Sequence, residues 1–515
     1  MNRWLVLAGC ALIVAACSDR PQPVAPRSHA DLLGGDDHVF DLSSVVTVDP
    51  SLKATNGSGT PQNSGNPPGR ATNVGPNVVA NQDKTFFPQN ETPIAVDPNN
   101  ASRLLAGAND YRHDLAACGI YGSSDGGATW NDVGEGTTVP PGAVAGGDPA
   151  TAFGPDGTAY HVCLGFTPVT NATSTTVIFV SKSTDLKTLQ PAGTVIATVG
   201  GGSDPLFGYF NDKEFVAVDT RSGSPHRGRI YVTWTRFKFD KTTDGYIESP
   251  IVLSYSDDGG ATWNGPHPVT PPDLNFDQGS VPAVGPNGEV YVVFENGNGT
   301  GFNGQAMVAQ SVDGGNSFAR PVKVDDIIEI CDHLNTDGRC ALKNSAWRVN
   351  SFPSVAVDGA SGSVYVVWGD YRGGNADVRF SRSTDGGRTW SHSTVVNSDL
   401  STADQFYPWI AVAEDGSVQV EFQQRDDTPG NRLLNTFLAT SRSGGIGFGK
   451  QLLVSSGPTD PNIGFSGTFI GDYNGVAATA HAVHPIWTDA RRVVCQGVVV
   501  DCRQNQDAVT ATVSF

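Results

Sequence analysis

The sequence predicts an all-β fold built from a repeated four-stranded unit. The 515 residues include 61 Gly and 33 Pro but only two Met, a composition typical of many strands and turns and few helices. From about Asn73 onward one pattern recurs. A strand of the type VAVD is followed by a Gly or Pro turn and a strand of the type VYVVW. A loop then leads to a third strand ending in S-x-D-x-G-x-T-W, before a short fourth strand. Recurrence at a regular spacing predicts a closed array of similar sheets.

Seven openings of this unit can be located, which gives units of roughly 45 to 70 residues, the size of propeller blades. The openings lie near Pro93, Pro149, Phe215, Val281, Phe352, Tyr407 and Phe469. The last unit ends at 508–515 with only a third strand, which would leave one sheet edge open to unwanted pairing. Because 75–80 resembles the fourth strands of other units, we expect residues near Asn77–Asn81 to complete this blade and close the ring.

The turn between the third and fourth strands carries the most specific motif. Its carboxylate can accept backbone N–H groups within the turn, its Gly residues supply positive φ, and its aromatic residue packs beneath the blade. These residue types explain the turn without any catalytic role, so we interpret the motif as a structural clamp. Full copies occur at 123–130, 256–263, 311–318 and 383–390, and eroded copies at 183–185 and 441–445.

This motif is the Asp-box, or BNR repeat, and the chain resembles the sialidase-like propeller superfamily over residues 73–515. The resemblance implies a single β-propeller of four-stranded blades. We favour seven blades, although sialidases proper have six. It also implies a glycoside hydrolase of sialidase type that acts on terminal acidic sugars of a glycan, as a monomer and without a cofactor.

The first residues have the layout of a lipoprotein signal. Arg3 precedes a short apolar run that closes on Val14-Ala15-Ala16-Cys17, which matches the bacterial lipobox. We therefore expect a signal over 1–17 with acylation at Cys17, and a flexible tether over 18–72, which is polar and rich in Gly and Pro. The propeller at 73–515 would then be anchored by lipid to the bacterial cell envelope, at the outer membrane or cell surface. An ordinary cleaved signal with an incidental cysteine is the alternative.

Six cysteines follow Cys17, and an even number in an exported chain favours disulfides. Zinc binding is the competing interpretation, but the spacing lacks any C-x-x-C pair. Segment 332–338 has oxygen donors like those of a calcium loop without its closing glutamate, so we expect a disulfide-closed turn and no metal site. Fifteen pairings are possible. Proximity in the sequence suggests Cys118 with Cys163, Cys331 with Cys340, and Cys495 with Cys502.

Charge and motifs exclude several functions. The net charge of −19 argues against general nucleic-acid binding, which relies on a basic face. The sequence contains no nucleotide-binding Gly motif, nucleophile elbow or His-Glu-x-x-His site.

The strand order of the repeat assigns polar residues to one face or the other. In a four-stranded blade, the second-to-third loops and the blade-to-blade loops share one face, and the Asp-box turns lie on the other. Blade-to-blade loops contribute charged residues that include Glu91, Lys213, Arg348 and Asp472. Arginine recurs at one station of the second-to-third loops in five units, and converging guanidinium groups suit a carboxylate, sulfate or phosphate. Alternatively, these residues form ion pairs within their own loops. They are Arg112, Arg236, Arg372, Arg425 and Arg491.

The resemblance also implies roles for individual residues. Sialidases hold the substrate carboxylate with three arginines and use a tyrosine nucleophile, a supporting glutamate and an acidic acid/base. The triad implied here is Arg112, Arg372 and Arg491. The implied nucleophile is Tyr407 or Tyr473, with Glu214 nearby and Asp148 or Asp212 as acid/base.

One departure from the family keeps a second class of function open. The Arg-Ile-Pro motif that carries the first sialidase arginine is absent, and Arg112 stands instead in Asp-Tyr-Arg-His. This departure and the seventh blade favour a propeller that binds a glycan, peptide or cell-wall component without turnover. A polysaccharide lyase on the same fold, with a His or Tyr base, is a third hypothesis.

Overall fold

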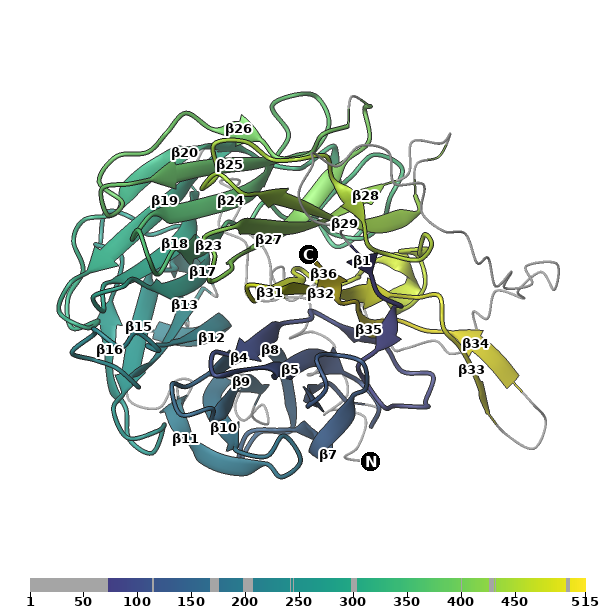
Figure 1. Ribbon diagram of the computed structural model, residues 1–515, viewed down its shortest axis with the longest axis horizontal. Coiled ribbons are helices and arrows are strands. Elements are labelled where there is room, and N and C mark those ends of the chain that lie inside the picture. Colours follow the sequence, from purple (N-terminus) through teal and green to yellow (C-terminus); the bar gives the residue numbers. More distant parts are fainter. Residues whose placement is uncertain are drawn as a thin grey trace.

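The computed structural model describes residues 73–113, 115–166, 176–197, 207–240, 242–243, 245–297, 303–399, 401–425, 430, 432–496 and 501–515. Their strands form seven antiparallel sheets of four or more strands, arranged as blades around one axis (Figure 1). The prediction of an all-β, seven-bladed propeller is confirmed. The expected signal at 1–17, its lipidation site Cys17 and the tether at 18–72 lie outside the described residues.

Six blades follow one plan, in which successive strands run outward from the axis. Blade 1 has β4 (Ile94–Asp97), β5 (Asn100–Asp110), β6 (Ala117–Ser123) and β7 (Asn131–Thr138), with β3 (Gln89–Asn90) beside β5. Blade 2 has β8 (Ala145–Phe153), β9 (Ala159–Phe166), β10 (Thr176–Ser183) and β11 (Gln190–Ala197). Blade 3 has β12 (Phe207–Val218), β13 (Ile230–Asp240), β15 (Ile251–Ser256) and β16 (Asn264–Pro268), with β14 (Tyr246–Glu248) beside β13.

The next three blades repeat this order. Blade 4 has β17 (Asp277–Val284), β18 (Val290–Gly297), β19 (Asn303–Ser311) and β20 (Val322–Ile328). Blade 5 has β23 (Ser354–Val357), β24 (Val364–Asp370), β25 (Asp377–Ser383) and β26 (Thr394–Val395). Blade 6 has β27 (Gln405–Val412), β28 (Val418–Arg425), β29 (Leu434–Ser441) and β30 (Leu452–Leu453). Outside the blades lie η1 (Phe465–Gly467) and the hairpins β21 (His333–Leu334) with β22 (Cys340–Ala341) and β33 (Val493–Gln496) with β34 (Asp501–Gln504).

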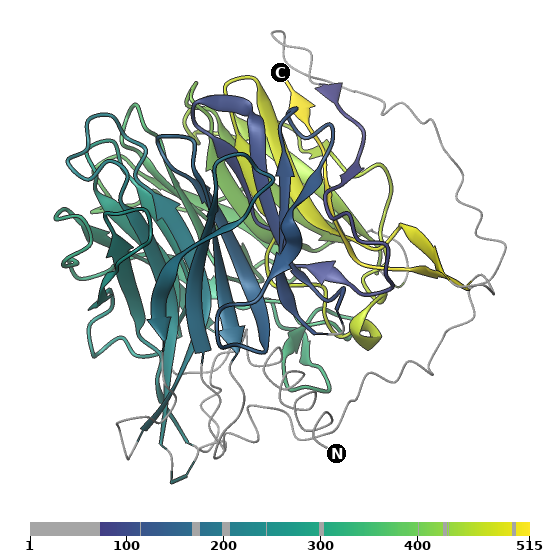
Figure 2. The ribbon, with the colours of Figure 1, turned by 90° about the horizontal axis from the view of Figure 1, so that it is seen from below.

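Blade 7 is completed by both ends of the described chain. Its first strands are β31 (Gly475–Ala478) and β32 (Ala482–Asp489), followed by β35 (Asp507–Thr510) and β36 (Val513–Ser514). The outer positions are taken by β1 (Asn73–Val74) and β2 (Val78–Val79), which pair with β36 and β35. Figure 2 shows the first described strand beside the C-terminal one. The prediction that residues near 77–81 close the ring is confirmed, and this pairing protects an edge that would otherwise be open.

The core lies between neighbouring blades. Every residue of β18 and β24 is buried, because a second strand is covered by a blade on each face. This explains why these strands read as near-continuous apolar runs and not as alternating ones. Trp234, Trp368 and Trp487 on three second strands are completely buried.

The Asp-box turns are clamps on one end of the blades. In the second copy, the Asp258 carboxylate accepts hydrogen bonds from the backbone N–H of Thr262 at 2.8 Å and from its hydroxyl at 2.6 Å. The Ser256 hydroxyl donates to Asp258 at 2.8 Å and accepts from the N–H of Gly260 at 2.9 Å. Gly259 and Gly260 have φ of 69° and 89°, which few other residues adopt. The bonds to Thr262 lower the pKa of Asp258 to about 2.

The three predicted disulfides are present. Cys118 of β6 pairs with Cys163 of β9 and joins blades 1 and 2, whereas the other two pairs close the hairpins β21–β22 and β33–β34. The Cys331–Cys340 bond therefore closes the turn that resembled a calcium loop. Within the described ranges, no helix is long and apolar enough to cross a bilayer.

Candidate functional site

Several first strands begin at the axis with a bulge. In blades 2, 3, 4 and 6 the pairing of the first two strands shifts register at this point, which bends the strand and re-aims its side chains. Four non-glycine residues have left-handed backbone here, three of them at these bulges and one, Glu91, just before the first strand of blade 1. They are Glu91, Asp148, Lys213 and Tyr407, with φ of 56°, 54°, 51° and 52°. Such conformations persist only where the surroundings hold them, and they concentrate at functional sites.

Ion pairs cross the axis between blades that are not neighbours. The Lys213 ammonium of blade 3 lies 2.7 Å from the Asp472 carboxylate of blade 7. Arg348, which precedes blade 5, binds both oxygens of Asp472 at 2.9 and 2.8 Å. Although burial opposes it, these two cations lower the pKa of Asp472 to about 2. All three side chains are buried, so this pairing holds blades 3 and 7 and the segment before blade 5 together.

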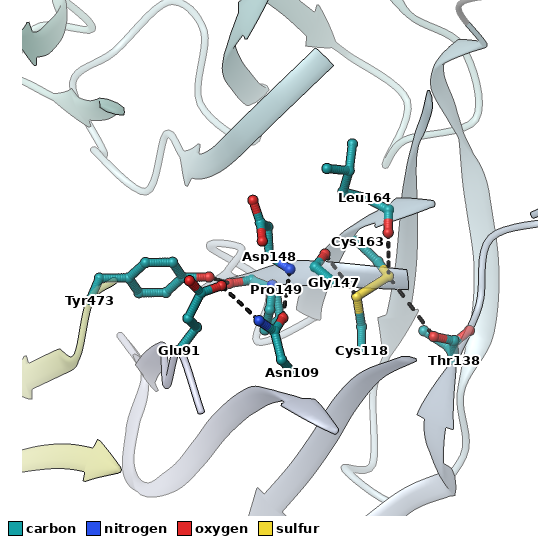
Figure 3. Close-up of a disulfide and its surroundings, with 10 residues drawn as sticks. All are labelled: Glu91, Asn109, Cys118, Thr138, Gly147, Asp148, Pro149, Cys163, Leu164 and Tyr473. Atoms are coloured by element: carbon teal, nitrogen blue, oxygen red, sulfur yellow. Dashed lines mark hydrogen bonds between the residues drawn. A yellow bond between two sulfur atoms is a disulfide. The ribbon is translucent and has the colours of Figure 1, made fainter. Parts of the chain in front are cut away.

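Three further carboxyl groups surround this pair. The Asn109 amide donates to Glu91 at 2.7 Å, and its oxygen accepts the Asp148 backbone N–H at 2.7 Å (Figure 3). Burial raises the pKa of Asp148 to about 6 against the opposing charge of Lys213. Burial, and then the charge of Asp148, raise the pKa values of Glu91 and Glu214 well above their usual range. These groups, with Lys213, Arg348, Asp472 and Tyr473, form what we call the axial cluster.

Two tyrosines reach the axial region from different blades. The Tyr473 hydroxyl donates to the carbonyl of Pro149 at 3.0 Å, beside Glu91 and Asp148 (Figure 3). Burial and the charges of Glu91, Asp148 and Glu214 raise the pKa of Tyr473. Tyr407 instead donates to the carbonyl of Arg348 at 2.8 Å. The structure thus places Tyr473, Glu214 and Asp148, from blades 7, 3 and 2, in one cluster.

A pocket of about 230 Å³ opens beside Glu91 and Asp148 and is also lined by Arg348. The Cys118–Cys163 disulfide braces its wall, since Cys118 lies 3.1 Å from the carbonyl of Gly147 and opposite Asn109 in the β5–β6 ladder (Figure 3). A ligand in this pocket would meet the carboxyl groups of Glu91 and Asp148. Asp212, the other predicted acid/base, is completely buried and accepts a hydrogen bond from Gln278 at 3.2 Å.

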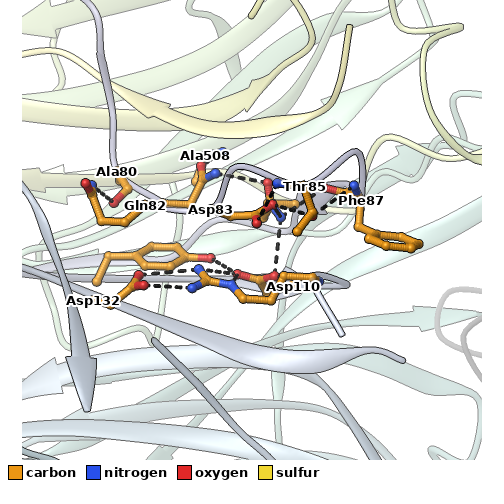
Figure 4. A network of polar contacts seen from close by, with 12 residues as sticks. Ala80, Gln82, Asp83, Thr85, Phe87, Asp110, Asp132 and Ala508 are labelled. Atoms are coloured by element: carbon orange, nitrogen blue, oxygen red, sulfur yellow. Dashed lines mark hydrogen bonds and ion pairs between the residues drawn. The ribbon is translucent and has the colours of Figure 1, made fainter. Parts of the chain in front are cut away.

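The three arginines of the predicted triad lie in separate loops with separate partners. Each binds the aspartate two residues before it, and each adds a different second contact. Figure 4 shows the first of these networks, around Asp110 and Asp132. The aspartate contacts are Arg112 with Asp110 at 2.7 Å, Arg372 with Asp370 at 2.7 Å and Arg491 with Asp489 at 2.6 Å.

The other two predicted arginines also have local partners. Arg425 binds Asp404 at 3.2 Å, and the Arg236 guanidinium lies over the ring of Tyr209 at 5.2 Å. Three of the five arginines, Arg112, Arg372 and Arg491, thus have an ion pair within their own loop, whereas Arg425 binds Asp404 of a different loop. Within the described ranges, no group of three His, Cys, Asp or Glu residues is arranged to hold a metal ion.

Sequence reasoning assigned no role to four members of the axial cluster. Glu91, Lys213, Arg348 and Asp472 were placed on blade-to-blade loops, but nothing in the sequence indicated that they pair across the ring. The signal that could have found them is their position, because Glu91, Arg348 and Asp472 precede the first strand of a blade and Lys213 lies at the bulge within β12.

No protein-family model matches the chain, and no curated protein matches it in sequence. Many solved structures resemble its fold. A Hadza microbial sialidase is 15% identical with a TM-score of 0.43, over 81% of this chain and 74% of that one. A GH93 α-L-arabinofuranosidase of Fusarium graminearum is 15% identical with a TM-score of 0.43, over 70% and 94%. A PL25 ulvan lyase is 11% identical with a TM-score of 0.44, over 83% and 96%. These likenesses concern the fold alone.

Proposed function

We propose that the protein is a glycoside hydrolase whose reaction centre is the axial cluster. The supporting observation is that a tyrosine, a glutamate and an aspartate from three blades lie close enough for the charges of Glu214 and Asp148 both to act on the phenol of Tyr473. Tyr473 is preferred to Tyr407 because the charges of Asp148 and Glu214 act on its phenol, whereas those that act on the phenol of Tyr407 are Asp472, Arg348 and Glu91. Asp148 is preferred to Asp212 because it lines the pocket.

The proposed reaction assigns one proton transfer to each carboxyl group. Asp148, with its pKa of about 6, is protonated in most molecules below pH 6, and in this form it donates its proton to the leaving oxygen as the glycosidic bond breaks. The Tyr473 oxygen attacks the anomeric carbon, and its proton passes to Glu214. Asp148 then accepts a proton from the water that hydrolyses the glycosyl-tyrosine, and Glu214 returns its proton to the phenolate. Because its pKa is raised, Glu214 accepts the proton of Tyr473 only in the fraction of molecules in which it is ionised.

The charged residues of the site indicate whether its substrate is an acidic or a neutral sugar. A sialidase acting on acidic sugars needs guanidinium groups for the substrate carboxylate, but Arg112, Arg372 and Arg491 already bind aspartates. The pocket presents Glu91 and Asp148, and its cation Arg348 is bound by Asp472. Because the only guanidinium group among the described residues that line this pocket is already ion-paired with Asp472, we propose neutral terminal sugars as substrates, with the acidic sugars as the tested alternative. The three disulfides indicate an oxidising compartment. We also propose that the protein is anchored to the cell envelope by a lipid on Cys17.

The test uses the purified protein with fluorogenic neutral glycosides and a fluorogenic sialoside. Asp148→Asn and Tyr473→Phe should each lower kcat by at least about a hundredfold, the usual contribution of a positioned acid or nucleophile. Tyr407→Phe is the matched control and should retain kcat within about threefold, because neither Asp148 nor Glu214 is among the charges that act on its phenol. Loss of activity in Tyr407→Phe alone would transfer the nucleophile role to that residue. Absence of turnover on every substrate by folded protein would overturn the proposal.

A binding module without turnover is the second candidate, and the ion-paired arginines favour it. Arg372→Ala and Arg491→Ala test the acidic-sugar form directly. We expect both variants to retain the parent's turnover of neutral substrates, because the guanidinium groups that they lack bind aspartates of their own loops. Sialoside turnover that is lost in both variants would instead establish the arginine triad. Glycan binding without turnover in the parent protein would assign the binding module.

A further inference from the structure

A second pocket, of about 300 Å³, lies between blades 6 and 7. It is built from the end of β28, the beginning of β29, the segment before β31 and the end of β32, which are the same ends of the blades that carry the axial cluster. The pocket shares no lining residue with the smaller one beside Asp148.

The wall of this pocket is fixed by hydrogen bonds to both blades. Thr459, in the blade-to-blade segment, exchanges two backbone hydrogen bonds with Leu434 of blade 6 at 2.9 and 2.8 Å. Its hydroxyl accepts the backbone N–H of Ala490 of blade 7 at 2.7 Å. The site is therefore formed before any ligand arrives, which reduces the entropy lost on binding.

Three buried polar atoms in the lining have no hydrogen-bond partner among the described residues. They are the side-chain oxygen of Gln423, the amide nitrogen of Asn474 and the hydroxyl of Thr488, on side chains of residues that are 2%, 3% and 8% exposed. The Gln423 amide nitrogen already donates to Thr436 at 3.3 Å, so only its acceptor is left. Buried polar atoms in folded proteins almost always have a hydrogen-bond partner, so three unpaired ones around one pocket favour a polar ligand there.

The chemistry of the lining matches a neutral sugar. A sugar hydroxyl both donates and accepts, so it can satisfy the Gln423 oxygen and the Asn474 amide together. Leu434 and Ile470 supply apolar surface for the C–H face of the ring. The charged lining residue, Asp460, is anionic and already accepts two hydrogen bonds from Asn462 at 3.0 and 2.7 Å, which disfavours an acidic ligand.

We propose that this pocket is a binding site for a neutral sugar unit. It does not depend on the hydrolytic role of the axial cluster. Asn474 directly follows Tyr473, so a glycan held here lies next to the segment that carries the proposed nucleophile.

Binding is measured by titration calorimetry on the full chain carrying Asp148→Asn, so that turnover cannot consume the ligand. The probes are neutral gluco-, galacto-, arabino- and xylo-oligosaccharides, with sialyllactose as the anionic probe. Thr488→Val should weaken binding of the best neutral probe about fivefold, the loss of one hydrogen bond. Thr235→Val is the matched control. Thr235 follows Trp234 in blade 3 as Thr488 follows Trp487 in blade 7, and its hydroxyl is also buried without a partner among the described residues.

The control should bind like the parent. Asn474→Ala, which removes a different contact, should also weaken binding if Thr488→Val does not fold. The proposal is overturned if no neutral probe binds, if Thr488→Val and Asn474→Ala bind like the control, or if sialyllactose binds more tightly than every neutral probe. Hydrolysis by the parent protein is measured in a separate assay. The parent can therefore lack hydrolytic activity and still bind a neutral sugar in this pocket, or hydrolyse glycosides without binding a sugar here.

Discussion

The two ends of the propeller use aspartate in opposite ways. At one end, the Asp258 carboxylate is exposed and is bound by groups at most four residues away. At the other end, the Asp148 carboxyl is buried among charged groups from other blades. The pKa is lowered to about 2 in the first case and raised to about 6 in the second. The protonation of an aspartate thus depends on whether local donors or burial dominates, not on residue type.

The largest expected effect is at the axis. Lys213→Met should lower the free energy of unfolding by about 3–5 kcal/mol, because it leaves the Asp472 carboxylate with one cation fewer in a buried site. Lys238→Met is the matched control. Its ammonium lies 3.2 Å from Glu248 at a partly exposed position, so we expect a loss below about 1 kcal/mol. Urea unfolding measures the free energy of unfolding of both variants. Equal losses would contradict the expectation that an ion pair at the axis stabilises the fold more than one at the surface.

The two aspartates should also give opposite pH dependence of stability. Folded Asp148 keeps its proton up to about pH 6, whereas the unfolded chain releases it near pH 4. The folded state therefore binds more protons in this window, and the free energy of unfolding should fall by about 3 kcal/mol as pH rises through it. The stabilising contribution of Asp258 is present above about pH 4 and is lost as pH falls towards 2.

Urea unfolding across a pH series, with Asp148→Asn and Asp258→Asn, measures this contrast. Asp148→Asn should flatten the profile between pH 4 and 6, and Asp258→Asn should flatten it below pH 4, as the two pKa values require. If both variants changed the stability in the same pH range, the opposite pKa shifts of Asp148 and Asp258 would be contradicted.

The smallest expected effect is at a single clamp. Asp258→Ala should cost about 1–2 kcal/mol, because it removes the acceptor of the Thr262 N–H and hydroxyl. Ser443→Ala, at the same station of the eroded box in blade 6, should cost less than about 0.5 kcal/mol, since its hydroxyl lies at 3.4 Å from Ser441. Thermal unfolding compares the two. A larger loss in Ser443→Ala would show that the clamp does not depend on the carboxylate.

Much of the fold could be predicted because its determinants are local or periodic. An Asp-box closes on donors within four residues, and a second strand buried on both faces is apolar throughout. The missing fourth strand was predictable because a ring leaves one edge to be paired, and residues 78–79 pair there as expected. The arginine ion pairs could also be predicted from the sequence, since Arg112 and Arg372 bind aspartates two residues before them.

By itself, the sequence determined the blades, their clamps, the closure of the ring and the short disulfide loops, through interactions between near neighbours or through a repeated pattern. Only the tertiary structure decided that Lys213 meets Asp472, 259 residues later, and that Asp148 lies beside Tyr473. Those contacts form where bulges at the beginnings of several first strands aim side chains at one axis. Burial there, which no local pattern records, then sets their pKa values.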